Sequence, residues 1–241
     1  SSIMSKKIAE GTQSLVLDVK AGRGAFMKDV SRAKQLAETM VEIGNAAGVK
    51  TIALITQMET PLGNAVGNAL EVSESIEVLN GKGPADVVEL TLALAQEMLE
   101  LAGIKKDPAM ALKDGSAFAT WKKMITAQGG NPEAKIPVAD KKENILAPKA
   151  GYIADLDAYA IGLSAWRLGA GRAKKEDIVS KTAGIICLAK EGDFVEKDQP
   201  VLELHIDDPA RLPMAKEALK TAFTIGSEPC EKRKIILERI S

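Results

Sequence analysis

Hydrophobic and polar positions along the first quarter of the chain follow two different periods. Residues 14–20 and residues 51–56 are short, almost wholly apolar runs, which are typical of strands buried on both faces. Between them, residues 29–47 place apolar side chains at helical spacing, behind an aspartate that suits a helix N-cap. Two strands joined by one such helix predict a right-handed βαβ unit. We therefore expect an α/β fold in which helices flank a parallel sheet.

The pattern changes after residue 130. Residues 131–144 are polar, aperiodic and contain proline, which is typical of a linker between domains. We therefore expect a partial α/β core over residues 1–144 and a smaller α+β domain over residues 145–241. Further helices are expected at 2–11, 72–79, 86–102, 108–113, 117–128, 158–168 and 211–223, and short strands at 145–149, 152–155, 184–188, 201–206 and 235–240.

A loop with two glycines, Gly22 and Gly24, follows the first predicted strand. Open α/β sheets bind ligands at the carboxyl ends of their strands, so a site is expected in this loop before any other. The spacing is equally typical of a tight strand-to-helix turn without a ligand. A dinucleotide fingerprint would need a third glycine where Met27 stands, which argues against a nicotinamide cofactor.

Residues 57–71 contain two Gly-Asn pairs around a turn that begins at Pro61. This composition is typical of a loop that leads into a helix. It is also typical of a backbone that must present carbonyl groups or approach a ligand closely. The residues alone leave both interpretations open.

Composition narrows the classes of partner. The chain has a net charge of −1, which gives no electrostatic argument for binding nucleic acid or an anionic membrane. Aromatic residues make up only 3% of it, which argues against stacking on single-stranded nucleic acid. No apolar run approaches the roughly 20 residues that span a bilayer. The two cysteines lack metal-ligand spacing, so we expect free thiols in a reducing cytoplasm.

Few single residues point to chemistry by their spacing. His205 is the only histidine and alternates with apolar neighbours, which favours a structural role over that of a catalytic base. A Ser-His-Asp triad or a His-rich metal site therefore has little support. Asp18 and Lys20 point to the same side of their predicted strand, so an ion pair is expected. Trp121 and Trp166 occur in apolar helical patterns and are expected in the core.

Blocks of sequence in a fixed order add a resemblance. They are SIMSKKIAEG at residues 2–11, LDVK at 17–20, GAFMK at 24–28, PLG at 61–63, GNALE at 67–71 and LGAGR at 168–172. Through these blocks the chain strongly resembles the thymidine and pyrimidine-nucleoside phosphorylases over essentially its whole length. It resembles the C-terminal part of such an enzyme, since the family's N-terminal helical domain and phosphate-binding residues have no counterpart in it. A start at Ser1, without an initiator methionine, fits that expectation.

The resemblance implies an activity and a base-binding site. The family are pentosyltransferases that catalyse reversible phosphorolysis: a pyrimidine nucleoside and phosphate give free base and (deoxy)ribose 1-phosphate. Such an enzyme must align both reactants and stabilise negative charge on the departing base. Ser2 and Lys6, one helical turn apart, match the family's base-binding serine and lysine, and Phe26 matches a residue that lines the base pocket. Arg23 stands where many relatives have serine.

The resemblance also implies a cation site. Bacterial members hold a monovalent cation, generally potassium, and backbone carbonyls with one carboxylate suit such a hard ion. The matching groups here are the carbonyls of Leu62 and Ala65 and the side chain of Glu74. Phosphate is the co-substrate, and the family binds it through upstream residues. The tail from about residue 145 resembles the family's α/β hammerhead domain.

For the intact protein, the resemblance implies a cytoplasmic homodimer in pyrimidine nucleoside metabolism, without nucleic-acid or membrane partners. Domain closure in the family needs the helical domain, so we expect the 241-residue chain alone to be inactive. Two other functions stay open: a related phosphorylase that acts on nucleoside monophosphates, and a non-catalytic binding or assembly module of the same fold.

Overall fold

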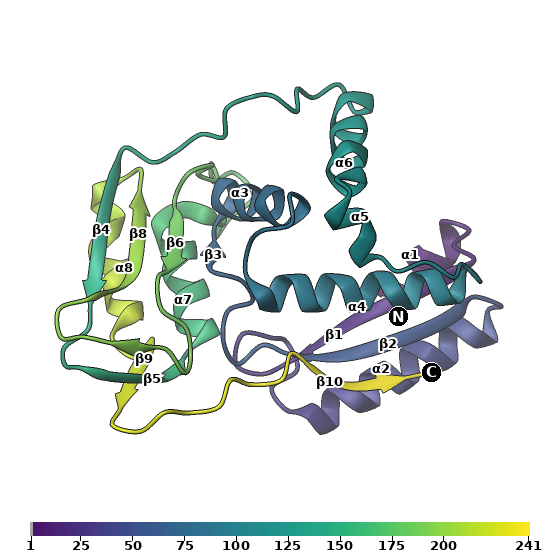
Figure 1. Cartoon of the computed structure of the whole chain (residues 1–241), viewed down its shortest axis with the longest axis horizontal. Helices are drawn as coiled ribbons and strands as arrows, with labels where there is room; N and C mark the ends of the chain where they lie inside the picture. The colour runs from purple at the N-terminus through teal and green to yellow at the C-terminus, as the bar shows by residue number, and fades with distance from the viewer. Residues whose placement is uncertain (1) are drawn as a thin grey trace.

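The computed structural model describes residues 2–241, and its first sheet joins the two ends of the chain (Figure 1). This sheet has the order β1-β2-β10 and consists of β1 (Ser14–Ala21), β2 (Lys50–Gln57) and β10 (Ile236–Ile240). Strands β1 and β2 are parallel, whereas β10 runs antiparallel to β2. The predicted βαβ unit and the α/β fold class are therefore confirmed.

Helices cover both faces of the first sheet. Helix α2 (Val30–Ala46) links β1 to β2 and packs on one face, and α4 (Ala85–Leu101) covers the other (Figure 1). Two covered faces explain why every residue of β2 after Lys50 is buried. The predicted cap of α2 is confirmed, since Asp29 accepts a hydrogen bond of 2.9 Å from the backbone N–H of Arg32. We call this sheet, with α1 (Ser2–Ala9), α2 and α4, the α/β unit.

Two further sheets form a smaller α+β unit, as expected. The first has the order β3-β6-β8-β4 and is antiparallel throughout, and the second has the order β7-β5-β9. Helices α7 and α8 pack on them around a core that includes Ile153, Ile161 and Leu204. The bounds are β3 (Ala65–Val66), β4 (Lys141–Leu146), β5 (Gly151–Leu156), α7 (Ala158–Ala165), β6 (Gly184–Cys187), β7 (Phe194–Val195), β8 (Pro200–Ile206), α8 (Leu212–Leu219) and β9 (Phe223–Gly226).

Several strands differ from the predicted organisation. The end of the predicted linker is strand, since Lys141 to Asn144 pair with β8 as part of β4. The boundary predicted at residue 144 therefore falls inside a strand. Two strand pairings also join residues on opposite sides of this boundary, because β3 pairs with β6 and β10 pairs with β2. Each of these pairings joins residues far apart in the sequence, so no local pattern could indicate it.

Helix boundaries and the tryptophans also need correction. The helix predicted to reach residue 223 ends at Leu219, and Phe223 begins β9. Trp166 is 41% exposed and Trp121 is half-buried against Phe118, so neither belongs to the core. The remaining helices are α3 (Asn68–Leu79), α5 (Ala109–Lys113), α6 (Ser116–Ala127), the π-helical turn η1 (Trp166–Ala170) and the 3₁₀ turn η2 (Pro209–Arg211). Across residues 2–241, no helix has both the length and the apolar surface needed to cross a membrane.

Candidate functional site

The glycine loop, residues 22–28, leaves the carboxyl end of β1 and packs closely on the segment that follows β2. Gly22 has a φ of +131°, and a Cβ there would lie 2.7 Å from the backbone nitrogen of Glu59. The backbone N–H of Gly24 donates to the carbonyl of Met58 over 2.9 Å. Both glycines thus permit close approach of two backbones, which is the tight-turn interpretation of their spacing.

Arg23 carries the loop's main polar contacts. Its guanidinium donates to both carboxylate oxygens of Asp155 over 2.6 and 2.8 Å, and to Glu59 over 2.8 Å. Asp157, the N-cap of α7, lies 3.2 Å away. The hydrogen bond from Arg23 holds the pKa of Asp155 below its usual range, against a smaller opposing effect of burial. This contact ties the α/β unit to β5 and α7 of the α+β unit.

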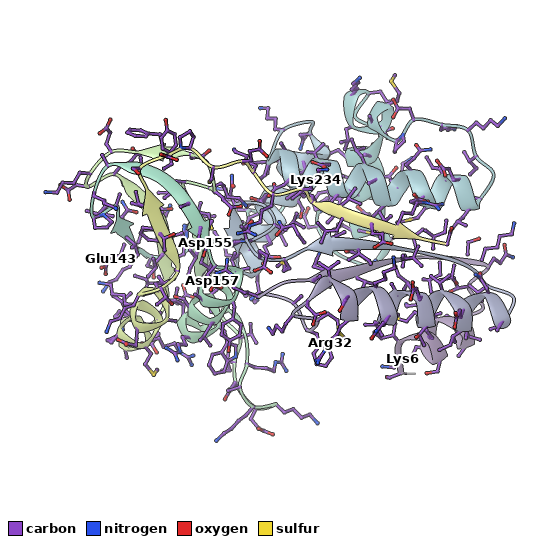
Figure 2. All side chains as sticks on the ribbon, turned by 90° about the horizontal axis from the view of Figure 1, so that it is seen from below. Lys6, Arg32, Glu143, Asp155, Asp157 and Lys234 are labelled. Atoms are coloured by element: carbon purple, nitrogen blue, oxygen red, sulfur yellow. The ribbon has the colours of Figure 1, made fainter. Side chains whose placement is uncertain are left out.

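The three residues expected at the base pocket are all exposed. Ser2 and Lys6 lie on the outer face of α1, whose buried side chain is Met4. Figure 2 shows Lys6 beside α2 and well apart from Asp155, the partner of the glycine loop. Phe26, in that loop, is 92% exposed. None of these three side chains is therefore enclosed in a pocket within residues 2–241.

Two of the three residues expected at a cation site, Leu62 and Ala65, lie in what we call the carbonyl turn, residues 61–65, and the third, Glu74, contacts this turn. Glu74 reaches back from α3, and its Oε1 accepts the backbone N–H groups of Asn64 over 2.8 Å and Ala65 over 3.0 Å. Gly63 has a φ of +69°, and a Cβ there would lie 2.1 Å from Oε2 of Glu74. The turn therefore wraps around the carboxylate, and burial raises the pKa of Glu74.

The backbone of Ala65 is directed at that carboxylate. The carbonyl of Asn64 accepts from the N–H of Cys187 over 2.7 Å, so Ala65 faces Ile186 in a non-hydrogen-bonded pair. Its N–H and carbonyl consequently point away from β6, toward α3. A cleft of about 350 Å³ borders this point, lined by Ala65, Glu74 and Pro84 among others.

Lys190 is a functional candidate that the sequence analysis missed. Its ammonium donates to the carbonyls of Pro61 and Gly63, both over 2.5 Å, and to Oδ2 of Asp86 over 3.2 Å. Asp86, which begins the helix predicted at 86–102, lies in the first turn of α4 and accepts the N–H of Gly63 over 3.1 Å. A single lysine in a turn carries no recognisable sequence signal.

Other predicted residues have structural roles. His205 is buried on β8 with Nε2 2.8 Å from Oε1 of Glu203, as expected of a structural histidine. The ion pair of Lys20 and Asp18 is confirmed at 2.8 Å. Within residues 2–241, no group of three His, Cys, Asp or Glu side chains could hold a metal ion. A cation in the carbonyl turn would therefore depend on backbone oxygens.

Comparison of the sequence with known proteins places the chain in a family. The model of the glycosyl transferase family a/b domain matches residues 1–120, and that of the pyrimidine nucleoside phosphorylase C-terminal domain matches residues 152–226. Thymidine phosphorylase of Mycobacterium tuberculosis (strain ATCC 25618 / H37Rv) is 48% identical over 241 residues, which are all of this chain and 56% of that protein. Pyrimidine-nucleoside phosphorylase of Geobacillus stearothermophilus is 42% identical over 258 residues, covering the whole chain and 58% of that protein. The chain belongs to the thymidine and pyrimidine-nucleoside phosphorylase family. It spans about half the length of the curated relatives that it matches.

Two contacts in this structure join the parts of the chain that the two family models match. Arg23 lies in the part matched by the a/b domain model, and its partner Asp155 lies in the C-terminal domain model. Likewise, Gly63 lies in the part matched by the a/b domain model, and its partner Lys190 lies in the part matched by the C-terminal domain model. The glycine loop and the carbonyl turn are thus two of the places where the matched parts of this chain are joined.

Proposed function

We propose that the intact protein catalyses the reversible phosphorolysis of uridine, thymidine or deoxyuridine to free base and (deoxy)ribose 1-phosphate. Phosphate is the co-substrate. The observation that carries this proposal is the 48% identity to a thymidine phosphorylase along all 241 residues, with both family models in the expected order.

In this reaction phosphate attacks the anomeric carbon while the base departs with growing negative charge. The enzyme gains most from a cation and a hydrogen-bond donor placed at the carbonyls of the base. We assign these roles to Lys6 and Ser2, and the lining of the base pocket to Phe26. Sequence similarity supports this assignment. All three side chains are exposed, so each is free to meet a substrate.

We also propose a monovalent cation, potassium, held by the carbonyls of Leu62 and Ala65 and the carboxylate of Glu74. The charge balance at the carbonyl turn supports it. Glu74 and Asp86 are two partly buried carboxylates that face one ammonium, that of Lys190, which leaves one negative charge for a cation. Carbonyl and carboxylate oxygens are the ligands that suit a hard ion. When bound, potassium would neutralise Glu74 and fix the turn.

The proposal extends to the state of the protein in the cell. Both Cys187 and Cys230 are free thiols in this structure, which supports a cytoplasmic location. Burial raises the pKa of the Cys187 thiol to about 12, so this side chain stays protonated. By analogy with its family, we propose that the intact protein is a homodimer.

The test of the base site uses a chimera in which this chain is joined to the segment of the Mycobacterium tuberculosis relative that it does not cover. Lys6→Met should lower kcat/KM for thymidine and uridine by about 10²–10³-fold, because it removes a charge that stabilises the departing base. The matched control is Lys7→Met, since Lys7 pairs with Glu10 over 3.0 Å on the same helix. The control should change kcat/KM by no more than about twofold.

The readout is phosphate-dependent release of thymine or uracil. Equal losses in the two variants would contradict the role of Lys6. A chimera that folds but shows no release and no saturable binding of base would contradict the proposed activity and favour a non-catalytic module.

A further inference from the structure

The ammonium of Lys190 contacts a cluster of three oxygens at the carbonyl turn, one with each of its N–H groups. A lysine ammonium has three N–H donors, and here they meet the carbonyl of Pro61, the carbonyl of Gly63 and the carboxylate of Asp86. The lysine side chain is 19% exposed and that of Asp86 is 20% exposed, so the contact is largely withdrawn from water. Two carbonyl oxygens and a carboxylate oxygen are ligands that would equally suit a free alkali or ammonium cation.

The backbone segment that carries Lys190 is held in place within the α+β unit. Lys190 lies between β6 and β7, and its backbone N–H donates to Asp193 over 2.9 Å. The next glycine, Gly192, donates its N–H to the carbonyl of Ile153 over 2.9 Å. Ala189 is buried beside the lysine. Because the backbone is held at these points, only the side chain must be ordered to bring the ammonium into the cluster.

We propose that Lys190 is a tethered cation: it supplies, from within the chain, the positive charge that the oxygens of Pro61, Gly63 and Asp86 require. The carbonyl turn then keeps its form there without a cation from solution, and the α+β unit is fixed to the α/β unit. The proposal can be tested apart from potassium at Glu74, since that ion would use other oxygens, those of Leu62, Ala65 and Glu74.

Removal of the tethered ammonium should leave a site that a small free ammonium can fill. Lys190→Ala removes the three carbons and the ammonium beyond Cβ, and propylammonium has the same three carbons and ammonium. The midpoint of thermal unfolding in choline chloride should fall by about 5–10 °C in this variant, since it leaves Asp86 and two carbonyls without their partner. Propylammonium, replacing choline at constant ionic strength, should restore at least half of that fall in a saturable manner.

The matched control is Lys232→Ala, because Lys232 lines a cleft together with Lys190 and Asp86 but is largely exposed and pairs with Asp193 over 3.2 Å. Neither this variant nor the wild type should respond to propylammonium. Should Lys190→Ala not fold, its yield on refolding is compared with propylammonium and with choline, and a higher yield with propylammonium is expected. Equal yields, or a response of Lys190→Ala no larger than that of the wild type, would overturn the proposal.

The double variant Lys190→Ala, Glu74→Gln separates this proposal from the potassium site. Propylammonium should still stabilise it, because Glu74 does not contact the ammonium of Lys190. Loss of the response in the double variant would show that the two sites are one and would overturn the tethered-cation proposal. A wild type whose unfolding is indifferent to potassium would count against the Glu74 site alone.

Discussion

Arg23 carries several charged contacts near the junction of the two units. It faces three carboxylates, those of Glu59, Asp155 and Asp157, and pairs with Asp155 through two parallel hydrogen bonds. Bidentate pairs of this kind are stronger than single contacts between charges. The arginine is 36% exposed, so solvent screening reduces the benefit. Asp155 and Asp157 lie together between the units in Figure 2.

The lowered pKa of Asp155 gives this contact a defined pH dependence. Its folded pKa lies below the ordinary value of 3.8, so the unfolded chain binds the proton more readily. The stabilisation is therefore complete above about pH 5 and is lost as the pH falls below 3.8 toward the folded pKa. Arg23→Ser should cost about 1–2 kcal/mol of unfolding free energy at pH 7, and much less near pH 2.5.

Urea unfolding at several pH values measures this difference. The matched control is Arg32→Ser, since Arg32 is 76% exposed and lies 3.5 Å from Asp29, and its cost should stay below about 0.5 kcal/mol. A cost of Arg23→Ser that is the same at pH 7 and pH 2.5 would contradict the pairing with Asp155. The family resemblance leads us to expect a serine at this position and so singles out Arg23. It does not indicate the partner Asp155, which lies 132 residues away.

At the scale of elements, the carbonyl turn shows how one backbone conformation can position a candidate ligand. Gly63 combines a φ of +69° with a carboxylate oxygen that would lie 2.1 Å from any Cβ. Gly48 has a similar φ of +78°, but nothing lies within 4 Å of its Cβ position. Comparison of the two glycines therefore separates the cost of the backbone conformation from the cost of displacing Glu74.

We expect Gly48→Ala to lower the free energy of unfolding by about 1 kcal/mol, because alanine disfavours a positive φ. Gly63→Ala should lower the free energy of unfolding by about 1–3 kcal/mol more than Gly48→Ala does, because it also forces Glu74 away from the N–H groups of Asn64 and Ala65. Urea unfolding of both variants measures the difference. Equal costs would show that Glu74 moves without loss and that the carbonyl turn does not hold it.

The elements predicted best are those whose pattern is local. The bounds of β1, α2 and β2 agree with the sequence within about two residues, since burial on both faces and a 3.6-residue period can be recognised from neighbouring residues. Strand β3 has only two residues and β4 begins in a polar segment, so their pairing partners decide that they are strands. For the same reason, the sequence predicts a strand at β10 but not its place beside β2.

At the scale of the whole molecule, the first sheet has an open side. Among residues 2–241, β1 has a neighbour only on the side of β2, so its other edge presents unpaired backbone groups. Helices α5 and α6 extend away from the sheet in Figure 1, and neither has a fully buried residue. These surfaces accord with a chain that covers 56% of its relative, and they offer places where further structure could pack.

From this partial coverage we expect the 241-residue chain to fold but not to catalyse phosphorolysis by itself. Lys6 and Phe26 are exposed, and the resemblance to the family implies that its phosphate-binding residues lie outside these 241 residues. Without a group that fixes phosphate in line with the anomeric carbon, the advantage of an oriented reactant is lost. Thymine release from thymidine should therefore be at least about 10³-fold slower than in the chimera.

Chromatography of the released base, with and without phosphate, measures both rates. A cooperative unfolding transition of the same preparation excludes misfolding as the cause. Phosphate-dependent release by the isolated chain at the rate of the chimera would show that these residues already hold the whole catalytic site.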